Sequence, residues 1–465
     1  MLGWLPGRER WHWFGLLPVA ALAALIEAGG ALAVFGLLRL VMDPEQGKTS
    51  PVVSGLLAAG PSPDPRALVA VLALGVALFY ILRAVFLAWS DWVRYGVVYR
   101  SAALVGERLL ARYLATDYLF HARRQSASLI EPLARATDIA YELGAASAVN
   151  IFAEVVIIAA LAAVLMVSAP PITLVTVGIV IAIVIVPIVV MRRTSIAIGE
   201  RERELYQQQL HVLQQSLGAI KDVKVTGRQR FFEERFRHVK RDLGATKQRR
   251  AWTASAARLG VEAALILCML LVVYLVMRQD QQGGQVVSVL ALFAYTGFRV
   301  VPSANRIMLN IGYLREAHPW IRSVDDDLRH VRVSSSREMT HDRPMLEDRL
   351  VCEHVSYRYE DGEPLALEDI SFTIQRGQSV GIVGPTGAGK STLVDVLLGL
   401  LPPTSGRVVI DGETLDGHER EWQRRIGYVS QDVYLLDDTL RRNVAFGVPD
   451  SAIDEARPGR AIEQA

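Results

Sequence analysis

The sequence predicts an α-helical membrane domain followed by an α/β domain. Apolar runs long enough to cross a bilayer occupy much of residues 13–309, the composition becomes polar near Val324, and a glycine-rich loop flanked by short apolar runs follows. Hydrophobic residues make up 51% of the 465 residues, more than is usual for a soluble enzyme. The formal net charge of +2 is not a basic excess, so we expect no nucleic-acid partner.

About six segments are candidates for transmembrane helices, because crossing the bilayer takes about 20 apolar residues. They cover residues 13–41, 67–89, 146–169, 172–191, 257–277 and 286–309.

The charge of the connecting loops predicts the orientation. The connection 43–64 has Lys48 as its only cation, whereas the connections 94–140 and 192–250 are long and rich in Arg and Lys. Loops with an excess of Lys and Arg stay in the cytoplasm. The sequence therefore predicts a multi-pass protein of the cytoplasmic (inner) membrane with both termini in the cytoplasm.

The two long cytoplasmic connections have helical spacing of their own. Gln, Glu, Arg and Leu dominate them and Pro is scarce, and loops of more than about 15 residues seldom lack structure. We expect the membrane helices to continue into the cytoplasm, turn and return, with short turn segments near residues 119–126 and 217–225.

The charged residues within the predicted spans include Glu27, Arg83, Glu154, Glu262 and Arg299. Such residues are costly in a bilayer and tend to face a cavity or a partner. One interpretation is a polar cavity that contacts cargo, with Arg83 and Arg299 suited to an anionic group. The other is structural pairing of Glu with Arg between helices, and the sequence leaves both open.

The change of composition near Val324 predicts a domain boundary. We expect a transmembrane domain with cytoplasmic helical extensions over residues 1–322, a polar linker over 323–348 and part of an α/β domain over 349–465. In that last part, β-like runs cover residues 350–357, 370–374, 379–383, 407–410 and 426–429. Cys268 and Cys352 are the only cysteines, too few for a disulfide framework or a metal cluster.

Residues 384–391 read G-x-x-x-x-G-K-S, a complete phosphate-binding loop (P-loop). The run 379–383 before it predicts a buried strand, and the run from Ser391 to about residue 401 predicts a helix. Glycine allows the tight bend that points backbone N–H groups at phosphate oxygens. We expect Lys390 to reach the β- and γ-phosphates of ATP and the Ser391 hydroxyl to hold Mg²⁺. The residues of this predicted cofactor site are Gly384, Pro385, Thr386, Gly387, Ala388, Gly389, Lys390, Ser391 and Thr392.

The order of these parts resembles an ATP-binding cassette (ABC) exporter half-transporter, with the membrane domain first and a P-loop NTPase domain second. The resemblance covers nearly the whole chain and includes residues 434–447, YLLDDTLRRNVAFG. It implies that Tyr359 stacks on adenine. It also implies that Gln431, in IGYVSQD, is the catalytic Q-loop glutamine, which contacts Mg²⁺ or the attacking water. The turn segments near 119–126 and 217–225 then correspond to coupling helices.

The resemblance further implies ATP-driven export or flipping by a dimer, formed either by two copies or with another half-transporter. Residues 298–306 and the stretch that starts at Tyr434 look most like bacterial flippases for lipid-linked oligosaccharides. Such an anionic, lipid-linked substrate would suit Arg83 and Arg299.

Part of the family pattern is absent from the 465 residues. No Leu-Ser-Gly-Gly-Gln signature, apolar strand ending in Asp-Glu or switch histidine follows Gln431, and the Asp-Gly pair 411–412 precedes it. Hydrolysis in this family needs a base on the Walker B strand and a signature loop, so we expect these 465 residues alone to be a poor ATPase. Two hypotheses stay open: a shortened exporter or flippase subunit, or a nucleotide-binding membrane protein without transport activity that regulates or partners an intact subunit.

Overall fold

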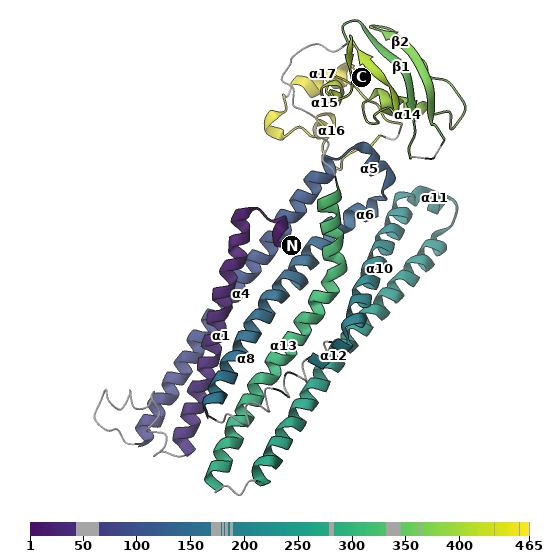
Figure 1. The fold of residues 1–465 in the computed structure, drawn as a ribbon. Coiled ribbons are helices and arrows are strands. Elements are labelled where there is room, and N and C mark those ends of the chain that lie inside the picture. Colours follow the sequence, from purple (N-terminus) through teal and green to yellow (C-terminus); the bar gives the residue numbers. More distant parts are fainter. Residues whose placement is uncertain are drawn as a thin grey trace. The chain divides into compact units, whose positions relative to one another are not determined.

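The computed structural model contains two compact units, Met1–Ser334 and Ser335–Ala465. The first is helical and the second holds the sheet, in the predicted order (Figure 1). The structure describes residues 1–42, 65–168, 189–278, 283–331, 346–360, 364–431, 433–454 and 456–464, together with the single residues 178, 181, 185, 186 and 362.

The long helices described in the first unit account for most of it. They are α1 (Gly7–Met42), α4 (Pro65–Leu114), α8 (Ala146–Ser168), α10 (Arg192–Gly218), α12 (Gln229–Arg278) and α13 (Gly283–His330). Both α4 and α12 have 50 residues. A helix of that length measures about 75 Å at about 1.5 Å per residue, whereas the hydrocarbon core of a bilayer is about 30 Å thick. Each therefore extends far beyond one membrane span.

Two described helical stretches are long and apolar enough to cross a bilayer, Ala70–Leu114 and Ser126–Ala160. The predicted spans 13–41, 257–277 and 286–309 lie on α1, α12 and α13, and 146–169 lies on α8 as far as Ser168. The predicted span 172–191 falls mostly outside the described residues.

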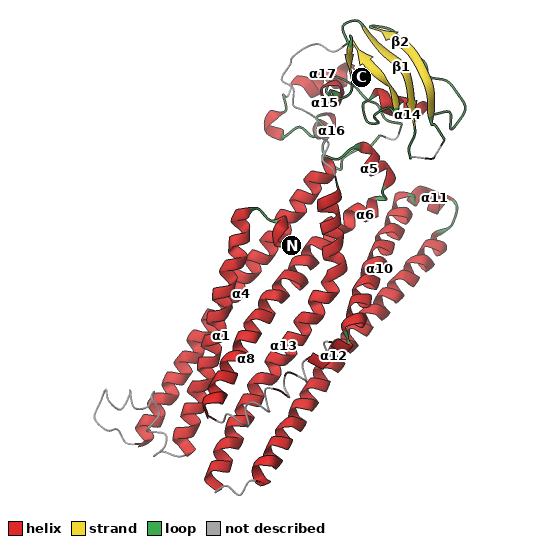
Figure 2. Cartoon of the chain, in the orientation of Figure 1, coloured by secondary structure: helices red, strands yellow, loops and turns green. Residues whose placement is uncertain are grey.

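Short helices turn the chain within the two predicted cytoplasmic connections (Figure 2). In the first, α5 (Tyr118–Arg123) and α6 (Ser126–Glu131) lead into two π-helical turns, η2 (Pro132–Ala136) and η3 (Ala140–Ala145), separated by α7 (Thr137–Ile139). In the second, α11 (Ile220–Val225) joins α10 to α12. The turn segments predicted near residues 119–126 and 217–225 are thus confirmed as the short helices α5 and α11.

The N-terminal residues pack into the core of the first unit. The turn η1 (Leu2–Trp4) precedes α1, and Leu5 is only 1% exposed. Leu5 and Trp13 belong to one apolar cluster with Tyr141 of η3 and Trp320 of α13. The indole N–H of Trp4 donates to Asp325 Oδ1 at 2.9 Å, which satisfies the one polar group of that ring. This cluster ties the start of the chain to the far end of α13.

Helices α10 and α13 cross closely at Gly199. A Cβ atom added there would lie 2.6 Å from the carbonyl oxygen of Glu316. Only glycine therefore allows the two backbones to approach this closely.

The second unit contains an antiparallel sheet in the order β2-β1-β3-β4. Its strands are β1 (Arg349–Tyr357), β2 (Leu367–Gln375), β3 (Ser405–Ile410) and β4 (Glu413–Thr414). Leu350 of β1 pairs with Ile374 of β2 on one side and with Ile410 of β3 on the other. The helices of this unit are α14 (Lys390–Leu397), α15 (Glu419–Gln423), α16 (Leu440–Val444), the turn η4 (Asp450–Ala452) and α17 (Ala456–Gln464).

Two of the five predicted strands are wrong. Residues 379–383 and 426–429 are described without any strand, and Val383 and Val429 are 95% and 87% exposed. A strand needs a neighbour to satisfy its backbone N–H and C=O groups. Within the described residues of this unit, every paired strand belongs to the antiparallel sheet, and neither segment has a partner there.

The linker bounds of 323–348 stay a prediction. Residues 323–330 are helical as the last part of α13, and residues 332–345 lie outside the described residues.

Candidate nucleotide-binding site

The loop 384–389 has a backbone that requires glycine at two positions. Gly387 and Gly389 have φ values of +86° and +80°, in the left-handed region that other residues rarely adopt. A Cβ atom added to Gly389 would lie 2.4 Å from the carbonyl oxygen of Ala366. Glycine therefore lets the loop bend closely against the segment before β2, and α14 begins directly after it.

Lys390 folds back over this loop. Its Nζ donates hydrogen bonds to the carbonyl oxygens of Gly384 and Pro385, both at 2.8 Å. The ammonium group is therefore held at the mouth of the loop, while the first turn of α14 directs unpaired N–H groups the same way. The side chain of Ser391, the next residue, is exposed. Thr392 is 7% exposed and turned inward.

Tyr359 lies beside the helix that follows the loop. Its hydroxyl oxygen is 3.0 Å from Thr392 Oγ1, and its ring packs edge-on against Tyr357 with 5.0 Å between centroids. The side chain is 36% exposed. The structure thus brings Tyr359 and the loop together across 33 residues of sequence.

Gln431 is not brought to the loop by any contact among the described residues. It is exposed and follows the strandless segment 426–429. Both predicted Mg²⁺ ligands, Ser391 and Gln431, therefore stay predictions. The described residues form no cluster of three or more His, Cys, Asp or Glu side chains suited to a metal. A cation here would depend on the Ser391 hydroxyl together with oxygens of the nucleotide.

The stretch after Gln431 is ordered by Arg442, a residue that the sequence reasoning did not single out. Its guanidinium donates to Asp438 Oδ2 at 2.8 Å and, through two nitrogens, to both carboxylate oxygens of Asp450. These bonds hold the pKa values of Asp438 and Asp450 below their usual range. Asn443 donates to the carbonyl oxygens of Leu436 and Asp438. We call Asp438, Arg442 and Asp450 the Arg442 clasp.

Two family matches cover most of the chain. The model of the ABC transporter transmembrane region matches residues 32–300, which is more than half of the chain, and the ABC transporter model matches residues 367–464.

The chain belongs to the ABC transporter family.

Flippases are among the relatives of this chain. This ABC transporter is 47% identical over 115 residues to an ATP-dependent lipid A-core flippase of Ralstonia nicotianae, covering 24% of this chain and 19% of the relative. It is 31% identical over 262 residues to a flippase of the same name from Cupriavidus pinatubonensis, covering 55% and 43%. A fatty acid ABC transporter ATP-binding/permease protein of Mycobacterium bovis is 43% identical over 113 residues, covering 24% and 18%. The matches thus span less than half the length of these relatives.

A solved structure has the same fold. A bacterial Atm1-family ABC exporter with ATP bound superimposes with a TM-score of 0.75 at 21% sequence identity, covering 96% of this chain and 76% of the exporter. The predicted fold class, an ABC exporter membrane domain followed by a nucleotide-binding domain, is confirmed, and the transporter is a membrane-embedded protein.

Three of the charged residues singled out in the membrane helices of this ABC transporter, Glu27, Arg83 and Glu154, form ion pairs in the structure. Arg83 of α4 donates to Glu27 of α1 at 3.0 Å. Glu154 of α8 receives two hydrogen bonds from Arg306 of α13, a residue that the sequence reasoning did not place among the intramembrane charges. The structural interpretation is therefore supported for Glu27, Arg83 and Glu154. Glu262 is exposed, and the side chain of Arg299 lies outside the described residues.

A second set of charges joins the helices beyond the predicted spans. Arg250 of α12 donates to Glu202 of α10 at 3.2 Å, and its Nε lies 2.7 Å from Glu316 Oε2 of α13, without hydrogen-bond alignment. Arg135 of η2 donates to the other oxygen of Glu202 at 3.1 Å. Burial raises the pKa of Glu316 to about 7, although the charge of Arg250 opposes the shift. We call Arg135, Glu202, Arg250 and Glu316 the interhelical charge network.

Proposed function

We propose that this protein is a subunit of an ATP-driven exporter or flippase of the cytoplasmic membrane. One observation carries the proposal: a single chain joins an exporter-type membrane domain, with short helices α5 and α11 at its turns, to a unit that holds a complete phosphate-binding loop. The first part can carry a substrate, and the second can supply energy from a nucleotide.

ATP is the nucleotide that the loop favours. The backbone of Gly384, Pro385, Thr386, Gly387, Ala388 and Gly389 surrounds the phosphates, and Lys390 exchanges its two carbonyl contacts for the β- and γ-phosphates. Phosphate oxygens are stronger acceptors than neutral carbonyls because they are charged. Tyr359, next to Thr392, stacks on the adenine ring.

Mg²⁺ is the cation that this site takes with ATP. The Ser391 hydroxyl, and Gln431 if its segment approaches the loop, are the protein ligands. The ion neutralises charge that develops on the β- and γ-phosphates during transfer.

The exporter works as a dimer with both termini in the cytoplasm. Two half-transporters, either two copies of this chain or this chain and a second kind, enclose ATP between their nucleotide-binding domains. Closure of these domains moves α5 and α11, the coupling segments, and the membrane helices then change the side to which they open.

The substrate is an anionic lipid or a lipid-linked molecule. The names of the relatives support this class, since two are lipid A-core flippases and one is a fatty acid transporter. The paired state of Arg83 with Glu27 argues against Arg83 as an open contact for the anionic group.

A flippase assay in proteoliposomes tests the proposal. The protein is reconstituted with fluorescent anionic or zwitterionic lipids, and the label in the outer leaflet is bleached with dithionite before and after addition of Mg-ATP. Because the signature and Walker B motifs that hydrolysis needs are absent from the 465 residues, the chain is reconstituted together with a half-transporter that supplies them. We expect ATP to move the anionic lipid between leaflets and the variant Lys390→Ala to reduce this movement strongly. If the rate is the same without ATP, or unchanged in Lys390→Ala, the proposed function is wrong.

A further inference from the structure

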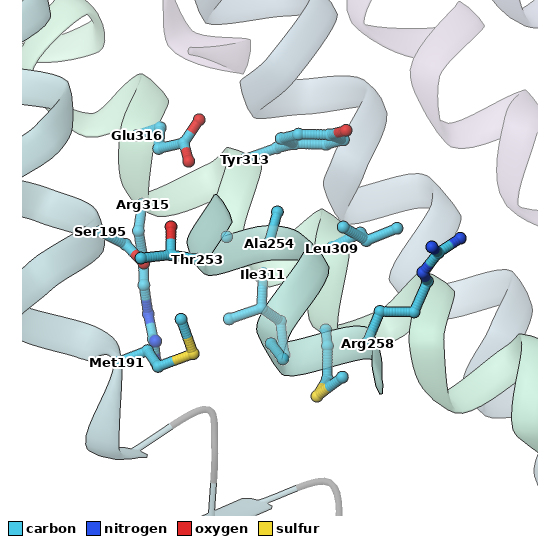
Figure 3. A pocket seen from close by; sticks show the side chains of 13 residues that line it. Met191, Ser195, Thr253, Ala254, Arg258, Leu309, Ile311, Tyr313, Arg315 and Glu316 are labelled. Atoms are coloured by element: carbon cyan, nitrogen blue, oxygen red, sulfur yellow. The ribbon is translucent and has the colours of Figure 1, made fainter. Parts of the chain in front are cut away.

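A cavity of about 60 Å³ lies between α10, α12 and α13 of the first unit (Figure 3). Much of its lining is apolar, with Ala254 and Ala257 of α12 and Leu309 of α13 among its residues. Two guanidinium groups also belong to the lining, and Figure 3 places Arg258 and Arg315 on opposite sides of it. The lining of the cavity therefore combines apolar side chains with two guanidinium groups on opposite sides.

Three predicted membrane spans end at this cavity. Met191 is the last residue of the span 172–191, Ala257 is the first of 257–277, and Leu309 is the last of 286–309. Trp252, which adjoins the lining residue Thr253, is 68% exposed. Exposed Trp side chains are typical of the level of the lipid head groups. In the proposed orientation, the cavity lies at the head-group level of the cytoplasmic leaflet.

Positive charge exceeds negative charge around the cavity. Arg258 is exposed and forms no ion pair with any side chain that the structure describes. Arg315 is partly buried and lies near a further cation, Arg192. The carboxylate in the lining, Glu316, is already 2.7 Å from Arg250 Nε. An anion at the rim would relieve this local excess of positive charge.

We infer that this cavity binds an anionic lipid of the cytoplasmic leaflet, with the charged head group at Arg258 and the adjoining apolar part against Ala254, Ala257 and Leu309. A volume of about 60 Å³ holds only part of a lipid, so the rest of the molecule stays in the bilayer. Basic pockets between transmembrane helices on the cytoplasmic side are suited to anionic head groups. The inference rests on the proposed function, because it names the place where the lipid substrate first meets the exporter.

Photo-crosslinking in nanodiscs tests this site. The full chain is reconstituted with a trace of diazirine-labelled phosphatidylglycerol or, in a parallel sample, of the corresponding phosphatidylcholine, and labelled peptides are mapped by mass spectrometry. We expect phosphatidylglycerol to label α12 and α13 next to the cavity, and Arg258→Gln to reduce that labelling about fivefold, as expected for one cation near an anionic lipid. Arg249→Gln is the matched control, an exposed arginine of the same helix that does not line the cavity, and it leaves labelling unchanged.

A second variant fills the cavity while keeping its charge. A Cβ atom added to Gly312 would meet nothing within 4 Å, so Gly312→Leu extends into open space without a backbone collision. We expect it to reduce phosphatidylglycerol labelling at least fivefold with Arg258 intact. Undiminished labelling in both Arg258→Gln and Gly312→Leu, equal labelling by phosphatidylcholine, or displacement of the lipid by inorganic phosphate would overturn the inference. Labelling by a photo-reactive ATP in the same nanodiscs reports the proposed function separately: normal ATP labelling without lipid labelling refutes the lipid site alone.

Discussion

The two units use charged side chains in different ways. In the first unit, Glu154 and Glu202 are 10% and 6% exposed, and their arginine partners come from helices far away in the sequence. In the second unit, the side chains of Arg442 and Asp450 are 47% and 52% exposed and only eight residues apart. A carboxylate removed from water must be paired, so its partner fixes the position of another helix. An exposed pair contributes little to global stability and orders only the segment between its members.

Removing one member of a buried pair should have the largest effect. Glu154→Ala leaves Arg306 without the carboxylate that joins it to α8. We expect the free energy of unfolding to fall by about 3 kcal/mol, at the lower end for buried pairs because Arg306 is 42% exposed. Thermal unfolding in detergent measures this loss, with the exposed Glu262→Ala as the control. The double variant Glu154→Met with Arg306→Met should recover much of the stability. A Glu154→Ala protein as stable as the parent would show that the pair does not join α8 to α13.

The interhelical charge network should make stability depend on pH. The pKa of Glu316 is raised to about 7 by burial, so the folded state holds its proton more tightly than the unfolded state does. The contribution of Glu316 to the free energy of unfolding is fully present below about pH 4.5 and is lost as pH rises through about 7. A shift of this size corresponds to about 3 kcal/mol between these limits. Glu316→Gln keeps the neutral form at every pH and should flatten this part of the profile. Unfolding measured at pH 5, 6, 7 and 8 checks it.

Glu204→Gln provides the matched control, because Glu204 is 61% exposed on the same helix as Glu202. Its profile should follow that of the parent. If Glu316→Gln is less stable than the parent by the same amount at pH 5 and pH 8, Glu316 is ionised at both pH values. Burial would then not raise its pKa as assigned.

The smallest global effect is expected at the Arg442 clasp. Arg442→Ala removes the contacts to Asp438 and Asp450, and both groups are exposed, so the unfolding temperature should hardly change. Hydrogen exchange should instead accelerate over residues 436–450 and stay constant in β1 and β2. Arg407→Ala, which removes an exposed pair with Glu353 elsewhere in this unit, is the control. Unchanged exchange over 436–450 would mean that Asn443 and Thr439 order the segment without Arg442.

The sequence alone predicted the long helices, the short helices α5 and α11, and the strands around Leu350, Ile370 and Arg407. These elements have local causes: apolar runs of sufficient length for the membrane helices, helical spacing for the connections, and β-like runs for the strands. The segments 379–383 and 426–429 have the same β-like composition but remain unpaired within the described residues. Composition predicts that a segment can form a strand, whereas pairing depends on a neighbour that the pattern does not contain.

In the candidate site, too, features with a local cause were predictable and contacts between distant segments were not. The loop glycines and Lys390 were predictable because a phosphate-binding loop needs glycines for its tight bend and a lysine at this spacing. Tyr359 contacts Thr392 in the helix after the loop, and its stacking on adenine stays a prediction. Arg306, Arg250 and the Arg442 clasp could not be predicted, because their partners are set by which helix faces meet. A weak signal existed only for Arg442, which lies four residues after Asp438.

Labelling with azido-ATP on membranes tests the central claim most directly, namely that the loop 384–391 binds ATP. Lys390→Ala removes the cation that is held at the loop, and we expect labelling of the second unit to fall at least tenfold, since charge-assisted contacts to phosphate are lost. Tyr359→Ala should weaken labelling moderately, through lost stacking, and Lys224→Ala in α11 should leave it unchanged. Equal labelling of the parent and Lys390→Ala would contradict the account.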